Sequence, residues 1–422
     1  MRVSEWRAYR VGGWVRDRLL GLPAGEVDWV VVGTTPEVLL ARGFRQVGSA
    51  FPVFIHPESG DEYALARTEC KSGHGYKGFV TRFDPTVTLE EDLRRRDLTI
   101  NAMAWDEVSG LIDPYGGRAD LEGRWLRHVS SAFGEDPLRV LRVARFAARF
   151  AGLGFRVAPE TLQLMGALAR SGELSTLTPE RVWQETVKAL TSDAPELYLR
   201  TLDACGALPI IFPELSALQG QIQPPQYHPE GDAWEHTLLV LAAAARMTPD
   251  PVTRFAALVH DLGKGSTPTE LLPRHHGHEE RGAVCVEGLC RRLRLPHDFQ
   301  YLGVMTAALH GRVHHALEMQ PRTLVRLLTD ADAFRQPERF EALLLACEAD
   351  ARGCGRPFVD YPQRRLLRAA LDRCRVVDAG PFQERGLTGK AVGAAIRQER
   401  VRRVRGLDRA SILAVGDAPA SA

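Results

Sequence analysis

The pattern of hydrophobic positions changes once along the chain, from short β-rich runs to helical repeats that begin after Ser130. Near the start, Trp29–Val32 is an apolar, largely β-branched run that ends in Gly33, and it predicts a buried strand. Residues 9–28 predict an earlier strand, a Gly-Gly turn, a short helix and a loop. The first part of the chain is therefore expected to contain both strands and helices.

The segments that follow continue this pattern. Residues 34–44 predict a short helix with a threonine N-cap and a proline at its first position, and residues 51–67 predict a β-hairpin. Residues 68–80 are rich in Gly, Lys and His, and they predict either a mobile loop near a site or a plain surface loop. Residues 94–97 contain three successive arginines and an aspartate, and a helix is expected to begin there.

The segment from 133 to 150 predicts an amphipathic helix. Its apolar residues recur at helical spacing and predict a buried stripe made of Leu138, Val140, Leu141, Val143, Ala144, Phe146 and Ala147. Polar residues recur at intervals of three and line one side, namely Asp136, Arg139, Arg142 and Arg145. Residues 178–190 predict a supporting helix, a further helix is expected to end at Cys205 and Gly206, and residues 221–229 predict a linker.

Length and composition indicate a multidomain globular protein. The 422 residues suggest two to four domains, and 45% of them are hydrophobic and 25% charged. The 54 basic and 53 acidic side chains nearly balance, so contacts with nucleic acid depend on local clusters of arginine. The chain contains no run of eighteen apolar residues and no signal-peptide core, which argues against a membrane protein or a secreted one. Seven scattered cysteines without a CxxC pair indicate reduced thiols in a cytoplasm.

Two carboxylates stand at the entrance of the predicted strand. Glu26 and Asp28 are one residue apart, and because strand side chains alternate, both are expected to point to the same face. Mg²⁺ prefers a few carboxylates together with phosphate oxygens. Gly12 and Gly13 allow backbone N–H groups to approach phosphate closely, and Arg16 follows them. The pattern predicts a site for a nucleoside triphosphate and its Mg²⁺.

This segment resembles the signature of the class II template-independent nucleotidyltransferases, which comprise CCA-adding tRNA nucleotidyltransferases and bacterial poly(A) polymerases. The family usually has Asp at the first acid, whereas this chain has Glu26. The resemblance implies that Glu26 and Asp28 are the catalytic residues and hold Mg²⁺. It also implies that Gly13 and Arg16 contact the bound triphosphate.

Two further motifs match the same family, RRDLTINA at 95–102 and EDPLR at 135–139. The nucleotide contacts that they and the following arginines imply are Arg96, Asp97, Asp136, Arg139, Arg142 and Arg145. The planar donor fork of arginine matches phosphate oxygens. In the family, Asp136 and Arg139 would hydrogen-bond to the base edge and act as a protein template for C and then A, because they offer an acceptor and donors.

A second group of potential ligands follows the apolar helix predicted at 255–262. His260 and Asp261 lie at its end, with His236 before them and Asp332 after them. Imidazole and carboxylate together suit Mn²⁺, Ni²⁺, Zn²⁺ or iron. Such a metal would activate a water molecule for attack on phosphorus.

The order of these residues, with HDLGKG intact, resembles the HD-type metal-dependent phosphohydrolases. The resemblance implies that Ni²⁺ or Mn²⁺ is held by His236, His260, Asp261 and Asp332. Asp330 is the alternative for the last ligand, and Asp332 is preferred because it precedes Ala-Phe. Three more histidines are candidates for a second metal or for phosphate binding: His276, His278 and His310.

The motifs occur in the order found in bacterial CCA-adding enzymes that carry an HD domain. The resemblance implies an α+β fold, with an N-terminal nucleotidyltransferase head that holds a small mixed β-sheet. An all-helical neck, an HD domain and a C-terminal helical region follow. The expected boundaries are 1–130, 131–225, 226–335 and 336–422.

The implied activity is addition of CMP, CMP and AMP, from CTP and ATP, to the 3′ end of tRNA with release of pyrophosphate. The HD region is implied to act on 2′,3′-cyclic phosphates, 2′-phosphates and phosphate monoesters, which would clean damaged tRNA ends. The expected partners are tRNA, CTP and ATP, without a membrane, in the cytoplasm. The sequence does not decide between a monomer and a homodimer. The arginines at 400–405 are equally consistent with tRNA contacts and with a solvated helix.

Three other interpretations are kept. A poly(A) polymerase shares the head motifs, but such enzymes lack an HD set and would extend RNA with A alone. A partial enzyme that adds only CC or only A would share all the motifs. A non-catalytic tRNA-binding protein could keep the scaffold, although the presence of both acids, Glu26 and Asp28, argues against it.

Overall fold

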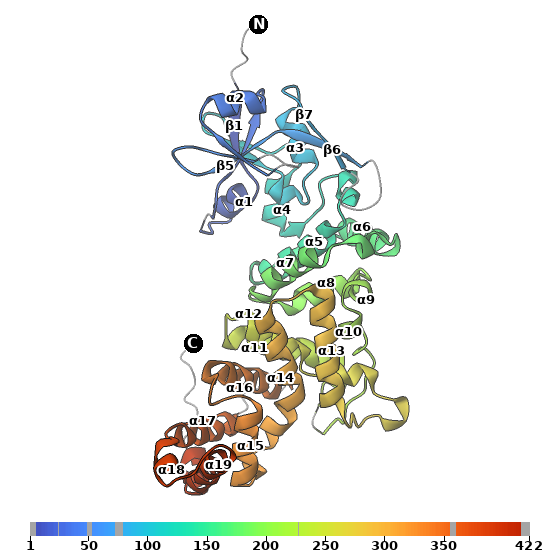
Figure 1. Ribbon diagram of the computed structural model, residues 1–422. Coiled ribbons are helices and arrows are strands. Elements are labelled where there is room, and N and C mark those ends of the chain that lie inside the picture. Colours follow the sequence, from blue (N-terminus) through green and yellow to red (C-terminus); the bar gives the residue numbers. More distant parts are fainter. Residues whose placement is uncertain are drawn as a thin grey trace. The chain divides into compact units, whose positions relative to one another are not determined.

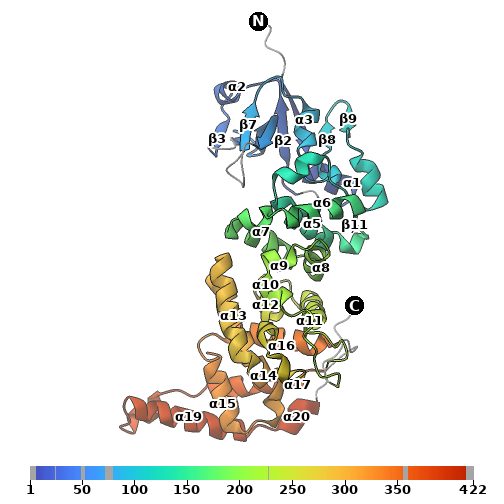
Figure 2. The ribbon, with the colours of Figure 1, turned by 90° about the vertical axis from the view of Figure 1, so that its right-hand side faces the viewer.

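The computed structural model describes residues 6–23, 25–48, 53–71, 79–226, 228–354 and 360–414, of which 69–71 and 79–83 are described by their backbone alone. These residues form two compact units (Figures 1 and 2). The first contains the chain up to Ala189 together with Leu197–Ile211, and the second contains Leu190–Glu196 together with the chain from Phe212 onward. None of the helices in the described ranges is long and apolar enough to cross a membrane.

The first unit is built on a seven-stranded mixed sheet. Its strands lie in the order β3 (Arg45–Val47), β4 (Val53–Ile55), β5 (Glu62–Leu65), β2 (Asp28–Val32), β1 (Arg7–Val11), β8 (Ala104–Asp106) and β9 (Gly110–Ile112). Strand β2 is antiparallel to β1 and parallel to β5. Val30 and Val31 contribute to two different hydrophobic clusters. Because successive side chains point to opposite faces and both faces are covered, this run is apolar without alternation.

The predicted elements of the head are present. Helix α1 (Gly13–Leu19) follows the Gly-Gly turn, α2 (Pro36–Ala41) begins after the N-cap Thr35, and β4 and β5 form the predicted hairpin. Strands β6 (Arg67–Lys71) and β7 (Phe79–Phe83) form a separate antiparallel pair. Residues 72–78, the middle of the loop predicted at 68–80, lie outside the described residues.

The helix expected to begin at residues 94–97 instead ends there. Helix α3 (Leu89–Arg94) starts after Thr88, whose side chain accepts from Glu91 N while the Glu91 carboxylate accepts from Thr88 N. This capping box fixes the start of the helix upstream of the arginines. Arg95 and Arg96 then fold back onto the buried carboxylate of Asp92. The remaining elements of this region are the 3₁₀ turn η1 (Thr99–Asn101) and helix α4 (Gly117–Gly123).

Helices follow the head, as predicted. Helix α5 (Leu138–Arg149) buries all seven apolar residues of the predicted stripe. The helices that follow it in the chain are α6 (Pro159–Arg170), α7 (Pro179–Leu190), α8 (Glu196–Ala204) and α9 (Leu208–Ile211), and β10 (Trp125–Leu126) and β11 (Arg156–Val157) form a short parallel pair. The 3₁₀ turns of this part are η2 (Ser131–Glu135), η3 (Ala151–Leu153) and η4 (Glu173–Thr176). The expected α+β fold, with a mixed sheet followed by helical regions, is confirmed.

The second unit is helical. Its helices are α10 (Pro213–Ser216), α11 (Ala233–Met247), α12 (Pro251–Val259), α13 (His278–Leu293), α14 (His297–His314), α15 (Pro321–Asp330), α16 (Pro337–Arg352), α17 (Pro362–Arg375), α18 (Gly380–Glu384), α19 (Lys390–Arg405) and α20 (Arg409–Ala414). Three 3₁₀ turns join them: η5 (Leu262–Ser266), η6 (Thr269–Leu271) and η7 (His315–Glu318).

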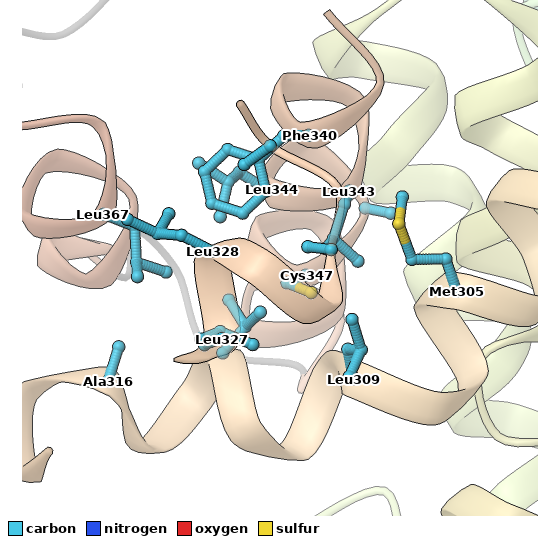
Figure 3. Packing of buried hydrophobic residues seen from close by; sticks show 14 of the residues in the cluster. Met305, Leu309, Ala316, Leu327, Leu328, Phe340, Leu343, Leu344, Cys347 and Leu367 are labelled. Atoms are coloured by element: carbon cyan, nitrogen blue, oxygen red, sulfur yellow. The ribbon is translucent and has the colours of Figure 1, made fainter. Parts of the chain in front are cut away.

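A large hydrophobic cluster fixes the helices of this unit relative to one another. Figure 3 shows Met305 and Leu309 of α14 beside Leu343 and Cys347 of α16, with Leu327 close to them. Helix α16 packs against α11, α12 and α14. Because α16 sits among three other helices, polar residues on its inner face are placed with little freedom.

Within the first unit, a buried carboxylate joins the head to the helices that follow it. Asp97 accepts hydrogen bonds from Arg142 Nε at 2.8 Å, Asn101 Nδ2 at 3.0 Å and Leu98 N at 2.8 Å. A second link runs from Arg149 Nη2 to Asp17 at 3.0 Å. Burial alone would raise the pKa of Asp97, but Arg142 and Asn101 together hold it well below its ordinary value. The position of α5 against the head therefore depends on Asp97 remaining ionised.

Replacing Asp97 with Asn is expected to destabilise the first unit by about 2 kcal/mol, because the charge-assisted hydrogen bonds that the buried Asp97 carboxylate accepts are weakened or lost. A group with a lowered pKa stabilises the fold above its unfolded value, near 3.8, and that stabilisation is lost as pH falls through the folded value. Acid unfolding of Asp97→Asn should therefore depend less steeply on pH below about 4. Six of the seven tryptophans lie in the first unit, so urea unfolding followed by tryptophan fluorescence monitors it.

The control for this measurement is Glu122→Gln, which removes an exposed i,i+4 pair with Arg118. Exposed pairs of this kind contribute roughly 0.5 kcal/mol or less. Equal unfolding midpoints for the Asp97 and Glu122 variants would contradict the structural role given to Asp97.

Candidate functional site

A cleft of about 660 Å³ opens in the first unit between the head and α5. It gathers nearly all of the predicted head residues, which are Gly13, Arg16, Asp28, Arg96, Asp97, Asp136, Arg139, Arg142 and Arg145. Glu26 is not in its lining but lies exposed two residues before Asp28, just ahead of β2. Residues from four separate parts of the sequence are thus brought to one cavity.

The Gly-Gly turn and the predicted carboxylate are neighbours because of the strand register. Asp28 is paired with Val11, the residue directly before Gly12. Gly12 has a φ of 68°, which favours glycine, and a Cβ there would lie 2.9 Å from Arg96 Nη1 and displace that guanidinium. Partial burial and the nearby Glu26 raise the pKa of Asp28, while Arg96 opposes the rise. Two carboxylates that repel one another at an open cleft form a donor set suited to Mg²⁺.

Arginine dominates the charge of this cleft. Nine arginines and three aspartates are among its lining residues, although the whole chain carries a net charge of only +1. Arg16 is the most enclosed of the predicted phosphate contacts: its guanidinium donates to Asn101 Oδ1 at 2.5 Å and lies about 5 Å from the ring centres of Phe146 and Phe150. A strongly cationic cavity with a carboxylate at its mouth is suited to a polyphosphate and a divalent metal.

The two predicted base-contacting residues are held in place by other groups. Asp136 accepts from Arg181 Nη2 at 2.8 Å and from the backbone N–H of Leu138 at 3.1 Å. Arg139 donates to the carbonyls of Ala132 and Arg95. Both side chains are therefore fixed on the cleft wall before any nucleotide is bound, which suits a rigid surface that discriminates between bases.

Helix α7 contributes residues that the sequence analysis took to be only structural. Arg181 lines the cleft and pairs with Asp136, and one helical turn later Glu185 pairs with Arg145. The i,i+4 spacing of Arg181 and Glu185 could have indicated this role, because it places both side chains on one face of a predicted helix. Helix α7 therefore bears directly on the wall that holds Asp136 and Arg145.

The second unit brings three of the predicted metal ligands together. His260 Nε2 lies 3.1 Å from Asp261 Oδ2, and His236 Nε2 lies 3.8 Å from the same oxygen. All three residues are almost completely buried. His236 comes from α11, and the other two from the end of α12, as the apolar pattern before His260 predicted.

The ring nitrogen of His260 that faces the cluster is free to act as a ligand. His260 Nδ1 is 2.7 Å from the carbonyl of Ala257, and His236 Nδ1 is 2.7 Å from the Glu230 carboxylate. The Ala257 carbonyl places the ring proton of His260 on Nδ1 and leaves a lone pair on Nε2, whereas His236 Nε2 contacts Asp350 Oδ1 at 3.0 Å. His260 Nε2 and Asp261 Oδ1 are buried and make no normal hydrogen bond within the described chain. Buried nitrogen and oxygen lone pairs without a hydrogen-bond partner suit the binding of a metal ion.

The structure does not place Asp332, the predicted last ligand, in the cluster. It lies just after α15 with a φ of 48° and is 3.9 Å from Arg335, and Asp330 pairs with Arg312 on the surface. The structure places Asp350 of α16 in the cluster instead, 3.0 Å from His236 Nε2 and 3.5 Å from His260 Nε2. The choice of Asp332 followed a sequence pattern, whereas the position of Asp350 depends on how α16 packs. The sequence feature that could have indicated Asp350 is its position as an acid within an alanine-rich helical segment.

A second group shares Asp261. His278 Nε2 and His310 Nε2 lie 3.4 and 3.5 Å from Asp261 Oδ1, and 3.1 Å from one another. Of the three histidines considered for an additional role, His276 is exposed and is not part of this group. A residue close to both groups is Lys264, whose Nζ lies 2.5 Å from Asp261 Oδ2 and 2.6 Å from Gln223 Oε1.

The carboxylates set the electrostatics of this cluster. Burial would lower the pKa of His260, but Asp261 and Asp350 raise it to about 9. The same interaction holds the pKa of both aspartates well below the ordinary range, against the effect of burial. The separations of 3.0 to 3.8 Å among these ligand atoms are close to the spacing around one ion with bonds of about 2.1 Å. The donor set of imidazole and carboxylate fits a transition metal.

Comparison with protein families assigns three consecutive regions. Residues 8–127 match the poly A polymerase head domain, residues 154–218 match the probable RNA and SrmB-binding site of polymerase A, and residues 233–335 match the HD domain. The head match covers the sheet and the cleft residues up to Asn101. Asp350 lies beyond the HD match, although it is adjacent to His236 in the fold.

Solved structures of similar fold include a Bacillus stearothermophilus CCA-adding enzyme in complex with CTP. That enzyme is 26% identical, with a TM-score of 0.62, and the match covers 95% of this chain and 89% of the other. A Thermotoga maritima CCA-adding enzyme complexed with tRNA has the same fold at 21% identity, with a TM-score of 0.61 and coverage of 97% and 90%.

Curated relatives match over nearly the full length. A multifunctional CCA protein from Thioalkalivibrio sulfidiphilus is 57% identical, covering 95% of this chain and 98% of its own. One from Methylococcus capsulatus is 56% identical with 95% of each chain covered. The chain therefore belongs to the multifunctional CCA protein family, and it is a CCA-adding nucleotidyltransferase that carries an HD phosphohydrolase domain.

Proposed function

We propose that the head cleft adds CMP, CMP and AMP in turn to the 3′ end of tRNA, using CTP and ATP. The observation that carries the proposal is the position of Asp28 at the mouth of a cleft lined by nine arginines. In each step the terminal 3′-hydroxyl attacks the α-phosphorus, a new P–O bond forms, and the bond to the β-phosphate breaks with release of pyrophosphate. The CTP and tRNA complexes of similar enzymes support these substrates.

The residues of the cleft divide this work between them. Glu26 and Asp28 would hold Mg²⁺, which supplies charge neutralisation at the phosphates when bound. Gly13 and Arg96 would lie along the triphosphate, with Arg142 and Arg145 on the opposite wall. Arg16 and Asp97, which are almost fully buried and internally paired, would mainly keep that wall in place.

Base selection would fall to Asp136 and Arg139. An acceptor and a fork of donors can pair with the edges of C and A, whereas the patterns presented by U and G differ. Their anchoring by Arg181 and by two backbone carbonyls supports a preformed protein template. A poly(A) polymerase, or an enzyme that adds only CC or only A, is the second candidate because it would share this wall.

Replacing Asp28 with Ala is expected to abolish nucleotide incorporation while tRNA binding changes little, because the substitution removes a metal ligand and leaves the arginines. Incorporation is measured with labelled CTP and a tRNA that lacks its CCA end, and binding by gel shift. Asp106→Ala, a change in the same sheet but outside the cleft lining, is the control. Normal incorporation by Asp28→Ala would rule out the assignment, and tRNA binding without any incorporation by the unmodified protein would favour a binding protein.

In the second unit, we propose a metal centre that hydrolyses 2′,3′-cyclic phosphates, 2′-phosphates and phosphate monoesters at damaged tRNA ends. His236, His260, Asp261 and Asp350 would hold Ni²⁺ or Mn²⁺, which activates water when bound. The buried Lys264 beside Asp261 would neutralise charge on the phosphate. The unpartnered Nε2 of His260 and Oδ1 of Asp261 support this assignment.

A second ion is supported by the ring nitrogens of the neighbouring group. His278 Nδ1 lies 2.9 Å from the carbonyl of His275, and His310 Nδ1 lies 3.1 Å from those of Thr306 and Ala307. With both ring protons on Nδ1, two Nε2 lone pairs face each other at 3.1 Å. A cation between them, also touching Asp261, would remove that repulsion.

The assignment of Asp350 is tested against Asp332. Asp350→Asn should reduce hydrolysis of a 2′,3′-cyclic nucleotide by at least about 100-fold, since even outer partners of a metal ligand contribute 10–100-fold. Asp332→Asn, the matched control outside the cluster, should leave hydrolysis unchanged. CCA addition by both variants should stay normal. Loss of hydrolysis in Asp332→Asn alone would return the ligand role to Asp332.

A further inference from the structure

A chain of three side chains extends outward from the proposed metal centre. His314 Nε2 lies 2.7 Å from Asp350 Oδ2, and His314 Nδ1 lies 2.9 Å from the hydroxyl of Tyr361. The other carboxylate oxygen of Asp350 is the one that faces His236 and His260. One oxygen of Asp350 therefore faces the proposed metal site, and the other contacts His314.

The hydrogen-bond directions in this chain follow from chemistry. An ionised carboxylate can only accept, so the proton on Nε2 of His314 must point at Asp350. In the neutral ring Nδ1 is then an acceptor, and the Tyr361 hydroxyl is its donor. Tyr361 thereby selects the tautomer of His314, and His314 fixes the rotation of the Asp350 carboxylate.

The helix packing holds each member in place. His310 and His314 are four residues apart on α14, so they share a face, and their ring centres are 6.1 Å apart. Tyr361 is 2% exposed, belongs to the same large hydrophobic cluster as Leu309 of α14, and directly precedes α17. Gln363 of α17 donates to the carbonyl of His314 at 3.1 Å. Three helices, α14, α16 and α17, thus converge on this hydrogen-bond chain.

We propose that His314, oriented by Tyr361, is a positioning residue that holds Asp350 in the rotamer needed to bind the metal. The inference rests on the proposed role of Asp350 and adds residues that lie outside the ligand set. It also explains why a half-exposed histidine at a helix end makes two short contacts instead of facing solvent. A metal ligand hydrogen-bonded in this way binds its ion more tightly because its orientation is set in advance.

The test is the affinity of the full-length protein for Mn²⁺ and for Ni²⁺, measured by calorimetric titration. His314→Ala should weaken binding by about 10–100-fold. His314→Gln should recover most of the affinity, because a glutamine amide can donate from nearly the same position as Nε2. Tyr361→Phe should give a smaller loss, since it removes only the group that selects the tautomer. His315→Ala, an exposed neighbour that contacts only Glu318 among the described residues, should bind like the wild type.

The outcomes distinguish the positioning role of His314 from the metal-binding role of Asp350, on which it rests. Wild-type affinity in His314→Ala would overturn the positioning role. Glutamine that performs as poorly as alanine would also overturn it, because the imidazole itself would then be required as a ligand. Undiminished metal binding by Asp350→Asn would instead refute the metal site. If His314→Ala does not fold, the metal affinity of His314→Gln decides. An affinity close to that of the wild type would support the positioning role, and an affinity well below that of Tyr361→Phe would overturn it.

Discussion

A buried carboxylate remains ionised only if charged or polar partners surround it, and each unit of this protein is arranged around one such group. In the first unit Asp97 is satisfied by Arg142, Asn101 and a backbone N–H, which fixes α5 against the head. In the second unit Asp261 is surrounded by histidines and Lys264. The two carboxylates differ in their hydrogen bonds. Asp97 has a complete set of hydrogen bonds and acts as a structural link, whereas Asp261 retains an unsatisfied oxygen that fits a metal ion.

This difference separates the two proposed chemistries. The head cleft presents donors that are already oriented by internal pairs, as suits recognition of a base and a triphosphate with little rearrangement. The HD cluster presents imidazole nitrogens and carboxylate oxygens that converge on one point, as suits metal-dependent hydrolysis. Both arrangements use side chains from distant parts of the sequence. Precise placement therefore comes from helix packing: α5 and α7 shape the cleft wall, while α14, α16 and α17 shape the surroundings of Asp350.

Much of this arrangement could be predicted from the sequence because local patterns carried it. The apolar run after Asp28, the glycines before α1 and the three-residue repeat of arginines on α5 each determine which face a side chain occupies. The start of α3 differs from the expected one because the capping box of Thr88 and Glu91 begins the helix before the arginines. Asp350, His314 and Arg181 were not assigned to a site, since their roles depend on contacts between helices far apart in sequence. Asp332 is favoured over Asp330 by its neighbours in sequence, but sequence neighbours do not determine which helix faces a cluster, and the structure brings Asp350 to it.

The most direct test of the central claim, that one protein wall selects first C and then A, is to resolve the reaction products to the nucleotide. Purified protein with Mg²⁺ and a tRNA lacking its CCA end is given CTP alone, ATP alone, or both. Two added C residues are expected with CTP alone, and one further A when both are present. Long A tails would make the protein a poly(A) polymerase, and an absence of any incorporation would contradict a catalytic role for the head.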